Sequence, residues 1–235
     1  MNVFPAWFYN DLQQVGVDFE DTAQVAAFDR NQRSSSVEAE RSLIEYLGIS
    51  TGHTVIDLGA GTGTFAIEAA LAGAHVYAID VSKAMLALAG QKAHNANAVN
   101  IKFHHAGFLT YEHKAEPVDF VVTKAALHHL PDFWKMVAFL RMAAMLKDGG
   151  VLYLRDAIFS FPPVEYQSHI DAWIKKAAKP AGEGFTTSDF EMHVREEHST
   201  FAWIIEGMLN KTGFEIASAN YLSPTIAQYV CRKKS

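Results

Sequence analysis

Cysteine is almost missing from the chain, which has one, Cys231, among 235 residues. A single thiol cannot form an internal disulfide, so the sequence excludes a disulfide scaffold and a cysteine-rich metal site. Long apolar runs are missing as well, because no stretch reaches the ~20 consecutive residues that a membrane span requires. The N-terminus also lacks the basic region and the apolar run of a secretion signal. We therefore expect a cytoplasmic protein with no membrane partner.

The chain also lacks an excess of basic residues. The chain has 20 Lys and Arg against 26 Asp and Glu, which gives a formal net charge of −6. Nucleic-acid-binding surfaces normally gather Lys and Arg to replace phosphate counterions, so no nucleic acid partner is expected. Hydrophobic residues make up 49% of the chain and charged residues 20%. At this length such a composition predicts one large domain, or one domain with an inserted cap.

The most informative stretch is Val-Ile-Asp-Leu-Gly-Ala-Gly-Thr-Gly at residues 55–63. An apolar run, a tight turn and a helix-like segment at 65–72 predict a buried strand that leads into a helix. Glycines in such a turn tolerate a positive φ and carry no Cβ that would keep a ligand away from the backbone. The amides of the turn and of the helix N-terminus would then face that ligand.

The spacing of these glycines argues against a dinucleotide. A dinucleotide site has Gly-x-Gly-x-x-Gly, whereas here the third glycine is Gly63 and the next residue is Thr64. No Gly-Lys-Ser/Thr follows that would hold a phosphate. Asp80 ends the next predicted strand, seventeen residues after Gly63, and a carboxylate there can accept from both hydroxyls of a ribose. The two features together indicate a ribose-containing ligand, while the glycines alone could also form a purely structural turn.

Strands and helices alternate through the first two thirds of the chain, which predicts an open parallel sheet with helices on both faces. Ligands of such sheets bind beyond the carboxyl ends of the strands. The predicted strands are 54–58, 75–79, 101–105, 118–123 and 151–156. The expected parts of this single domain are an irregular N-terminal arm (1–34), a cofactor-binding core (35–157), an inserted substrate cap (158–198), and a C-terminal helix and antiparallel hairpin (199–235, with strands 214–221 and 226–231).

Local signals predict several boundaries within this plan. Ser35 has capping-box spacing with a glutamate three residues later, which predicts that the first helix of the core begins there. The Lys-Asp-Gly-Gly sequence at residues 147–150 predicts a turn before the fifth strand. In the cap, Ser188 is expected to begin the second helix, and Glu196 and Glu197 are expected on a solvated helix face.

Two further motifs point to a family. Residues 127–132 are Leu-His-His-Leu-Pro-Asp, and residues 145–154 are Met-Leu-Lys-Asp-Gly-Gly-Val-Leu-Tyr-Leu. Together with the glycine turn, they make residues 37–157 similar to the class I S-adenosylmethionine-dependent methyltransferases. The stretch most resembles the methyltransferase type 11 family, which includes the ubiquinone and menaquinone biosynthesis enzymes. Several motifs in the same order make the resemblance specific.

The resemblance implies an α/β Rossmann-like fold, in which a mostly parallel seven-stranded sheet ends in an antiparallel hairpin and has helices on both faces. It implies S-adenosyl-L-methionine as the methyl donor, S-adenosyl-L-homocysteine as the product, and a small, partly apolar acceptor methylated at O, N or C. Two rivals are a non-catalytic S-adenosylmethionine-binding protein and a nicotinamide-dependent oxidoreductase, the latter disfavoured by the offset glycine and the terminal hairpin. Neither the acceptor nor the oligomeric state follows from the sequence.

The resemblance also assigns cofactor contacts position by position. Asp57 would steady the glycine turn and reach the cofactor ammonium through water, and Asp80 would bind the ribose. The remaining positions that it implies around the cofactor are Gly59, Ala60, Gly61 and Gly63 beneath the methionine part, Val81 and Met85 beside the adenine, and Gly107 and Phe108 facing the adenine. Many relatives have an acid at position 107 that accepts from the adenine amine, so Gly107 leaves this contact unassigned.

The candidates for the chemistry are three residues that follow the fourth predicted strand. Lys124 would pair with the cofactor carboxylate or meet an acidic substrate, or it extends into solvent from the strand end. His128 and His129 lie where the reacting groups should meet, and histidine has the pKa of a general base. Either could be catalytic or orient the acceptor, with a structural or cofactor-side role as the alternative, and no histidine spacing predicts a metal site. Apolar residues of the cap, of the helix after it and of the N-terminal arm would line an acceptor pocket, or they are ordinary core; they are Trp173, Phe185, Phe190, Trp203 and Met208, with Trp7, Phe8 and Tyr9.

Overall fold

The sheet has the strand order and directions of the predicted fold. The structure, a computed structural model, describes residues 5–13 and 19–235. The strands are β1 (Thr54–Leu58), β2 (His75–Asp80), β3 (Ile101–His105), β4 (Val118–Lys124), β5 (Leu146–Phe159), β6 (Thr200–Phe201), β7 (Phe214–Ser223) and β8 (Ile226–Lys233). Their spatial order is β3-β2-β1-β4-β5-β8-β7, with β6 paired to β5 beside this path. β1 to β5 run parallel, whereas β8 is antiparallel to β5 and β7. The predicted seven-stranded sheet with its closing hairpin is confirmed, and β6 is an addition.

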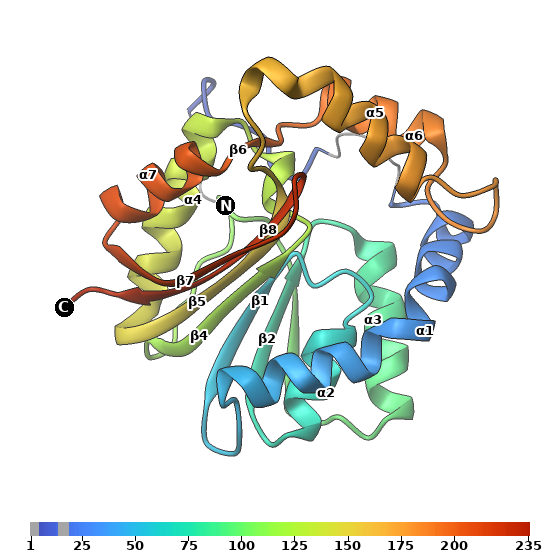
Figure 1. Cartoon of the computed structure of the whole chain (residues 1–235). Helices are drawn as coiled ribbons and strands as arrows, with labels where there is room; N and C mark the ends of the chain where they lie inside the picture. The colour runs from blue at the N-terminus through green and yellow to red at the C-terminus, as the bar shows by residue number, and fades with distance from the viewer. Residues whose placement is uncertain (1–4, 14–18) are drawn as a thin grey trace.

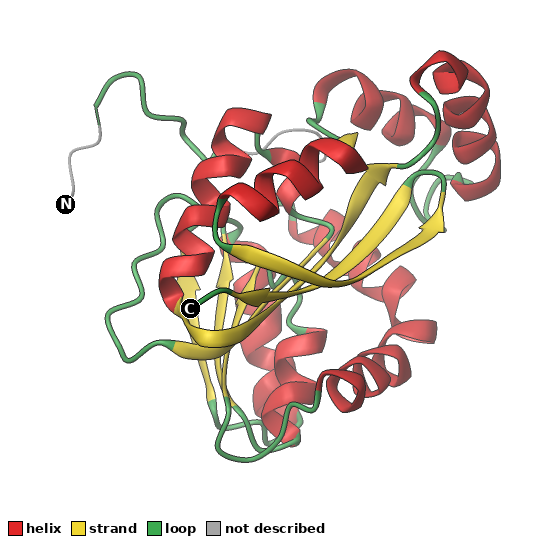
Figure 2. Cartoon of the chain, turned by 60° about the vertical axis from the view of Figure 1, so that its left-hand side comes forward, coloured by secondary structure: helices red, strands yellow, loops and turns green. Residues whose placement is uncertain are grey.

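Helices cover both faces of this sheet (Figures 1 and 2). The helices of the core are α1 (Thr22–Leu47), α2 (Thr64–Leu71), α3 (Lys83–Asn95), α4 (Asp132–Met145) and α7 (Ala202–Lys211). Neighbouring residues of β1 pack into different hydrophobic clusters, because side chains alternate across a strand. Val55 packs with Ile44 of α1 and Phe65 of α2, whereas Ile56 packs with Phe139 of α4. None of the described helices is long and apolar enough to cross a bilayer.

The strand order reverses at β1, which has β2 and β3 on one side and β4 and β5 on the other. Open α/β sheets bind their ligands beyond the carboxyl ends of the strands at such a reversal. The cap consists of η2 (Pro163–Glu165), α5 (Tyr166–Ala177) and α6 (Thr187–Glu196), and a short helical turn, η1 (Leu127–His129), follows β4. In Figure 1 the cap helices lie beyond the carboxyl ends of the strands, so the cap covers the end of the sheet where a ligand is expected.

The first helix starts much earlier than the sequence predicts. α1 begins at Thr22, so it runs through Ser35, and residues 22–34 are helical where an irregular arm was expected. The serines around position 35 are weak helix formers and good caps, which is why local sequence indicated a helix start there. Contacts with the core override this preference, since Val25 of the added segment is buried and Asp29 pairs with Lys92 of α3 at 2.6 Å. Tertiary packing, and not local propensity, therefore sets the length of α1.

The fifth strand is longer than predicted at both ends. β5 begins at Leu146, so the residues expected in a turn at 147–150 lie inside the strand. Leu146 and Val151 pair with residues of β4 that are only two positions apart, which makes the segment between them a bulge. A bulge accommodates extra residues without ending the ladder. At its other end β5 continues to Phe159 and leads directly into the cap.

The two cap helices pack on each other through aromatic side chains. The ring centroids of Trp173 on α5 and Phe190 on α6 lie 5.2 Å apart in an edge-to-face arrangement. Thr186, rather than Ser188, caps α6, because its hydroxyl accepts from Asp189 N at 3.3 Å while the Asp189 carboxylate accepts from Thr186 N at 2.7 Å. The two half-buried aromatic side chains thus join the cap helices, and their part in an acceptor pocket stays a prediction.

Cys231 lies in the inner strand of the closing hairpin. It pairs with Leu152 of β5 on one side and with Ile216 of β7 on the other, and it is fully buried. Burial raises the pKa of its thiol to about 12. Because the thiolate is the reactive form of cysteine, this buried side chain behaves as a small apolar residue.

Candidate functional site

The glycine turn between β1 and α2 has three positive φ angles, 78° at Gly59, 54° at Gly61 and 79° at Gly63. Two of these glycines are needed for packing within the protein. A Cβ on Gly59 would lie 2.3 Å from Ala126 Cβ, and a Cβ on Gly63 would lie 2.8 Å from Ala89 Cβ. A Cβ on Gly61 would meet nothing within 4 Å. Of the three, Gly61 is therefore the one whose backbone borders open space where a ligand could lie.

Asp80 connects the end of β2 to this turn. Its Oδ2 accepts from Gly61 N at 2.7 Å and its Oδ1 accepts from Ser82 N at 2.8 Å, and the residue is 9% exposed. Burial raises the pKa of Asp80 although the backbone amides oppose the shift. Each carboxylate oxygen has a second lone pair, so Asp80 can accept further hydrogen bonds from a ligand. Ser82 caps α3, since its hydroxyl accepts from Met85 N at 3.0 Å.

Asp57 of β1 is a buried acid with an unused oxygen. It is 2% exposed, and its Oδ2 has no hydrogen-bond partner among the described residues. Burial raises the pKa of Asp57 to about 7, against the opposing charge of Lys124. Lys124 itself pairs with Glu40 of α1 and lies 5.0 Å from the centroid of the Phe65 ring. Lys124 is thus held by the protein, and its predicted contact with a cofactor carboxylate stays a prediction.

An acid from the N-terminal segment occupies the space above Gly107. A Cβ on Gly107 would lie 2.2 Å from Asp11 Oδ2 and 3.1 Å from Val81 Cγ1. Asp11 is buried, its Oδ2 accepts from Leu109 N at 2.7 Å, and its Oδ1 has no hydrogen-bond partner among the described residues. Burial raises the pKa of Asp11. Of the residues predicted near the adenine, Val81 thus lies against Gly107, and Met85 and Phe108 are buried.

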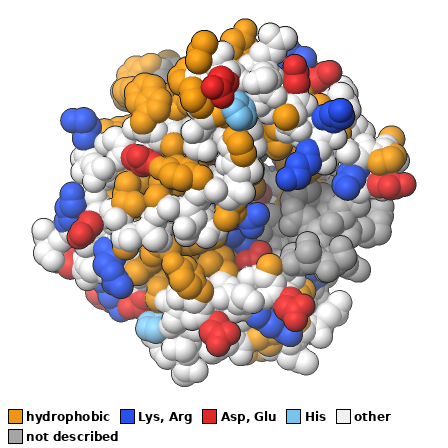
Figure 3. Space-filling model, viewed as in Figure 1, with side chains coloured by type: hydrophobic (Ala, Val, Ile, Leu, Met, Phe, Trp, Pro, Cys, Tyr) orange, Lys and Arg blue, Asp and Glu red, His pale blue; other side chains and the backbone are white. Residues whose placement is uncertain are grey.

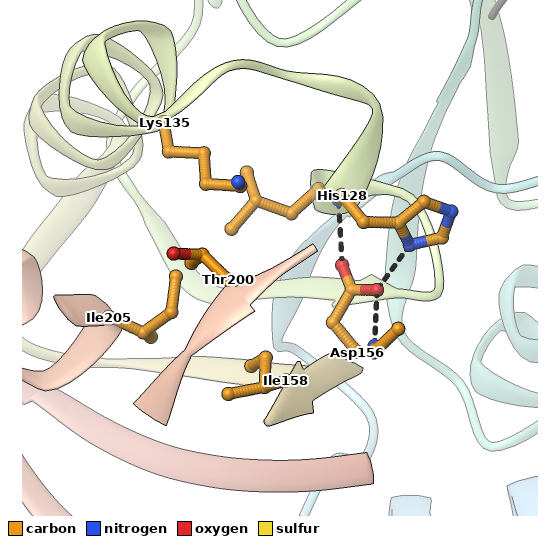
Figure 4. A pocket seen from close by; sticks show the side chains of 8 residues that line it. His128, Lys135, Asp156, Ile158, Thr200 and Ile205 are labelled. Carbon is orange, nitrogen blue, oxygen red and sulfur yellow. Dashed lines mark hydrogen bonds and ion pairs between the residues drawn. The ribbon is translucent and has the colours of Figure 1, made fainter. Parts of the chain in front are cut away.

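His128 is held between two carboxylates. Its Nδ1 bonds Oδ1 of Asp156, which lies near the carboxyl end of β5, and its backbone N donates to Asp156 Oδ2 at 3.1 Å (Figure 4). Its Nε2 lies 3.3 Å from Glu197 Oε2. Burial opposes charge on this imidazole, but Asp156 and Glu197 raise the pKa of His128. The pKa of Asp156 would rise through burial, yet His128 lowers it to about 2.

His129 is the less engaged member of the pair. Its ring centroid lies 4.3 Å from that of His128, and its Nδ1 is buried with no hydrogen-bond partner among the described residues. Burial and the neighbouring His128 lower the pKa of His129 to about 4. The hydroxyl of Tyr9 donates to His129 O at 3.4 Å, so the N-terminal segment also touches this part of the site.

Two functional candidates were missed or misjudged by sequence reasoning. Asp11 carries no motif, and the one hint of it was the missing side chain at Gly107. Glu197 was expected on a solvated face together with Glu196, but its side chain is 7% exposed against 47% for Glu196. A local pair of acids cannot indicate that one of them turns inward toward residues distant in sequence.

Charged side chains of both signs occur on the molecular surface (Figure 3). In the face shown in Figure 3, Lys and Arg side chains are interspersed with Asp and Glu and do not form one continuous basic patch. Protein surfaces that bind nucleic acids normally cluster their basic residues. The view therefore offers no support for a nucleic acid partner on this face.

A family model described as a methyltransferase domain matches residues 55–150, which contain the glycine turn, Asp80 and the histidine pair. Phosphoethanolamine N-methyltransferase 2 of Caenorhabditis elegans is 34% identical over 100 residues, which are 42% of this chain and 22% of that protein. An uncharacterized methyltransferase of Bacillus thuringiensis is 28% identical over 179 residues, which are 75% of this chain and 76% of that protein.

Solved structures share the fold. Magnesium protoporphyrin IX methyltransferase from Synechocystis, with bound S-adenosylmethionine, has a TM-score of 0.60 at 19% identity, covering 95% of this chain and 88% of that one. Phosphoethanolamine N-methyltransferase 2 of Haemonchus contortus, in complex with phosphomonomethylethanolamine and S-adenosylhomocysteine, has a TM-score of 0.70 at 15% identity, covering 92% and 58%. At such identities the likeness concerns the fold alone.

Proposed function

We propose that the chain is a class I S-adenosylmethionine-dependent methyltransferase, since a methyltransferase-domain model matches residues 55–150, and that it methylates a small, partly apolar organic molecule at O, N or C. The observation that carries this proposal is a row of three buried acids along neighbouring strand ends. Asp57 belongs to β1, Asp80 ends β2, and Asp11 lies on Gly107 after β3. S-adenosylmethionine presents three donor groups in a row, an ammonium, a ribose diol and an adenine amine. The three carboxylates, as hydrogen-bond acceptors, match these hydrogen-bond donors in kind and order.

The methionine end of the cofactor would lie over Gly61 beside Asp57. Gly61 borders open space, so the methionine part of the cofactor can approach the Gly61 backbone without a steric clash. The unpaired Oδ2 of Asp57 would accept a hydrogen bond from the ammonium, directly or through water. A charge-assisted hydrogen bond of this kind offsets the cost of ionising a buried carboxyl group.

The adenine would extend toward β3. If Asp80 binds the ribose and the methyl group faces the reversal between β1 and β4, the base must point the opposite way along the sheet edge. There it meets Gly107, which has no side chain to accept from the amine. Asp11 Oδ1, buried and unpaired, can accept that hydrogen bond. Asp11 would therefore replace, from the N-terminal segment, the acid that many relatives carry at the position of Gly107.

Replacing Asp11 by alanine tests this adenine contact. We expect Asp11→Ala to weaken S-adenosylhomocysteine binding by about 1–2 kcal/mol, because a hydrogen bond to a charged acceptor is lost. S-inosylhomocysteine has a carbonyl oxygen in place of the adenine amine, so its affinity should not fall in the same variant. Titration calorimetry with both ligands measures the two changes.

A second variant controls for damage to the N-terminal segment. In Asp11→Ala combined with Gly107→Asp, the acid returns from the loop after β3 into the space that Asp11 leaves. S-adenosylhomocysteine affinity should recover at least in part. Equal losses for both ligands, with no recovery in the double variant, would mean that Asp11 only holds the segment in place.

On the acceptor side, the protein mainly has to orient the nucleophile and exclude water. The sulfonium of the bound donor supplies a methyl group that is already activated for displacement. The free Nδ1 of His129 can accept a hydrogen bond from a hydroxyl or amine of the acceptor. His128 contacts carboxylates at both of its ring nitrogens, so its proposed role is to position η1 and its neighbour His129.

An acceptor screen tests the proposed function. Wild-type protein is incubated with S-adenosylmethionine and a library of small alcohols, phenols, amines and activated carbon acids, and S-adenosylhomocysteine is measured. We expect release that depends on an acceptor, and a kcat about tenfold lower for His129→Ala with S-adenosylhomocysteine affinity within about twofold of wild type. A cofactor that binds but turns over with no member of the library would contradict the proposed acceptor class.

A further inference from the structure

Two histidines and a glutamate converge between the cap and the end of β4. His193 and Glu197 are four residues apart at the end of α6, so their side chains share one helix face, and His128 approaches from η1. The candidate ligand atoms, one from each residue, all lie within 4.8 Å of one another. From these residues we propose a site for one divalent transition-metal ion, with zinc as the representative ion, held by His128, His193 and Glu197.

The central oxygen of this cluster lacks the hydrogen bonds expected of a buried carboxylate. Glu197 Oε2 contacts His193 Nδ1 and lies 3.3 Å from His128 Nε2. It nevertheless makes no hydrogen bond of acceptable geometry among the described residues. Side-chain exposures of 10% for His128, 14% for His193 and 7% for Glu197 exclude most solvent. Buried polar atoms that converge in ion-pair contact but with poor hydrogen-bond geometry are suited to a common third partner.

The outer nitrogen of each imidazole is already occupied. His128 Nδ1 is bonded to Asp156, and His193 Nε2 lies 2.8 Å from Ser199 Oγ. Metal-binding histidines characteristically hold their second nitrogen in this way, with a carboxylate, carbonyl or hydroxyl that fixes the ring. The inner nitrogens, His128 Nε2 and His193 Nδ1, are thereby left to face Glu197. The cluster thus has both a ligand set and the partners that orient it.

The donor set indicates the class of ion. Two imidazole nitrogens and one carboxylate suit zinc and other first-row transition ions, whereas magnesium and calcium prefer oxygen ligands throughout. A dication would also offset the negative charges of Glu197 and Asp156, which otherwise face each other across His128. Lys135, the nearby buried cation, bonds Asp132 and His198 O and is engaged elsewhere.

Three protein ligands leave at least one coordination position open. An ion there would join α6 of the cap to the turn after β4, and its open position would lie next to the His128–His129 turn. It could then hold an anionic or ionisable oxygen of the methyl acceptor. This role of the ion rests on the proposed function, whereas metal binding itself does not.

Metal binding can be measured on the full chain after dialysis against EDTA. Calorimetry with zinc chloride, checked by elemental analysis after gel filtration, should give one ion per chain. His193→Ala should weaken zinc binding at least about 100-fold, since a direct ligand is lost. His169→Ala is the matched control, because His169 Nε2 lies 3.1 Å from Glu165 Oε2 at the same four-residue spacing in the cap, and the described residues place no third ligand beside them. This control should leave zinc affinity unchanged.

Glu197→Gln provides a second, nearly isosteric variant in case His193→Ala does not fold, and it should also lose zinc. Cobalt should bind in place of zinc with the visible absorption of a low-symmetry, nitrogen-containing site. Absence of a stoichiometric ion, or equal zinc affinity in wild type, His193→Ala and Glu197→Gln, overturns the proposal. If S-adenosylhomocysteine still binds in that case, the metal site fails while the proposed methyltransferase function stands.

Discussion

Replacing Asp57 by asparagine is expected to stabilise the protein against unfolding at pH 8 while weakening its binding of S-adenosylhomocysteine. The carboxyl group of Asp57 is 2% exposed, and burial raises its pKa to about 7. An unfolded chain returns that pKa to about 3.9. Above pH 7 the folded protein must therefore hold an ionised group that its surroundings disfavour, and asparagine removes this requirement.

The sign and the pH window of the effect follow from proton linkage. Between about pH 4 and pH 7 the folded protein binds one proton more than the unfolded chain at this site, so the wild-type free energy of unfolding falls as pH rises. The gain in Asp57→Asn should be small at pH 4 and should reach about 4 kcal/mol above pH 7, for a shift of roughly three pKa units. Urea unfolding at several pH values measures this difference.

Asp119→Asn is the matched control with the opposite sign. Burial would raise the pKa of Asp119, but its bonds with Lys147 and with Thr54 N lower it. The ionised Asp119 carboxylate therefore contributes to the free energy of unfolding above pH 4, and this contribution is lost as pH falls. Asp119→Asn should consequently be less stable than the wild type at pH 8. A gain in Asp57→Asn that does not depend on pH would contradict the account given for Asp57.

The second large effect is expected for Asp80→Ala. Removing this carboxylate should weaken S-adenosylhomocysteine binding by about 1–3 kcal/mol, because the charged hydrogen bonds to the ribose hydroxyls are lost. The amides of Gly61 and Ser82 also lose their acceptor, so the glycine turn becomes less well fixed. Calorimetry with S-adenosylhomocysteine measures the change, and 2′-deoxy and 3′-deoxy analogues should lose affinity mainly with the wild type.

An exposed acid separates this local effect from the change in net charge. Asp148 is largely exposed, and Asp148→Ala alters the formal charge by the same amount. Its S-adenosylhomocysteine affinity should match that of the wild type. Unchanged affinity in Asp80→Ala would refute the ribose contact and would move the cofactor away from the end of β2.

The sheet could be predicted because its information is local. Each core strand is a short apolar run with a polar residue at or near its carboxyl end, and the glycine turn fixes where the first helix after a strand begins. Helix and strand lengths were less predictable, since α1 continues through weak helix formers and β5 absorbs two glycines in a bulge. In both elements, contacts with distant parts of the chain override the local signal.

The parts of the site that sequence reasoning missed all depend on distant pairs. Asp11 bonds Leu109 N, 98 positions away, and nothing around it in the sequence distinguishes it from other acids of the N-terminal segment. Glu197 meets His128 through the position of the cap, which no periodic pattern encodes. The histidine pair could be found because its residues are adjacent, whereas His193 could not be connected to them.

The buried thiol described above has a practical consequence. Cys231 lies between β5 and β7, so a thiol reagent can reach its sulfur only while the closing hairpin is detached from the sheet. Cys231 is the sole cysteine of the chain. Its modification by a thiol reagent can therefore be followed without removing other cysteines and without introducing a new one. The molecule therefore contains its own probe of how often the edge of its sheet opens, and slower modification upon ligand addition would reveal that the cofactor end and this edge open as one cooperative unit.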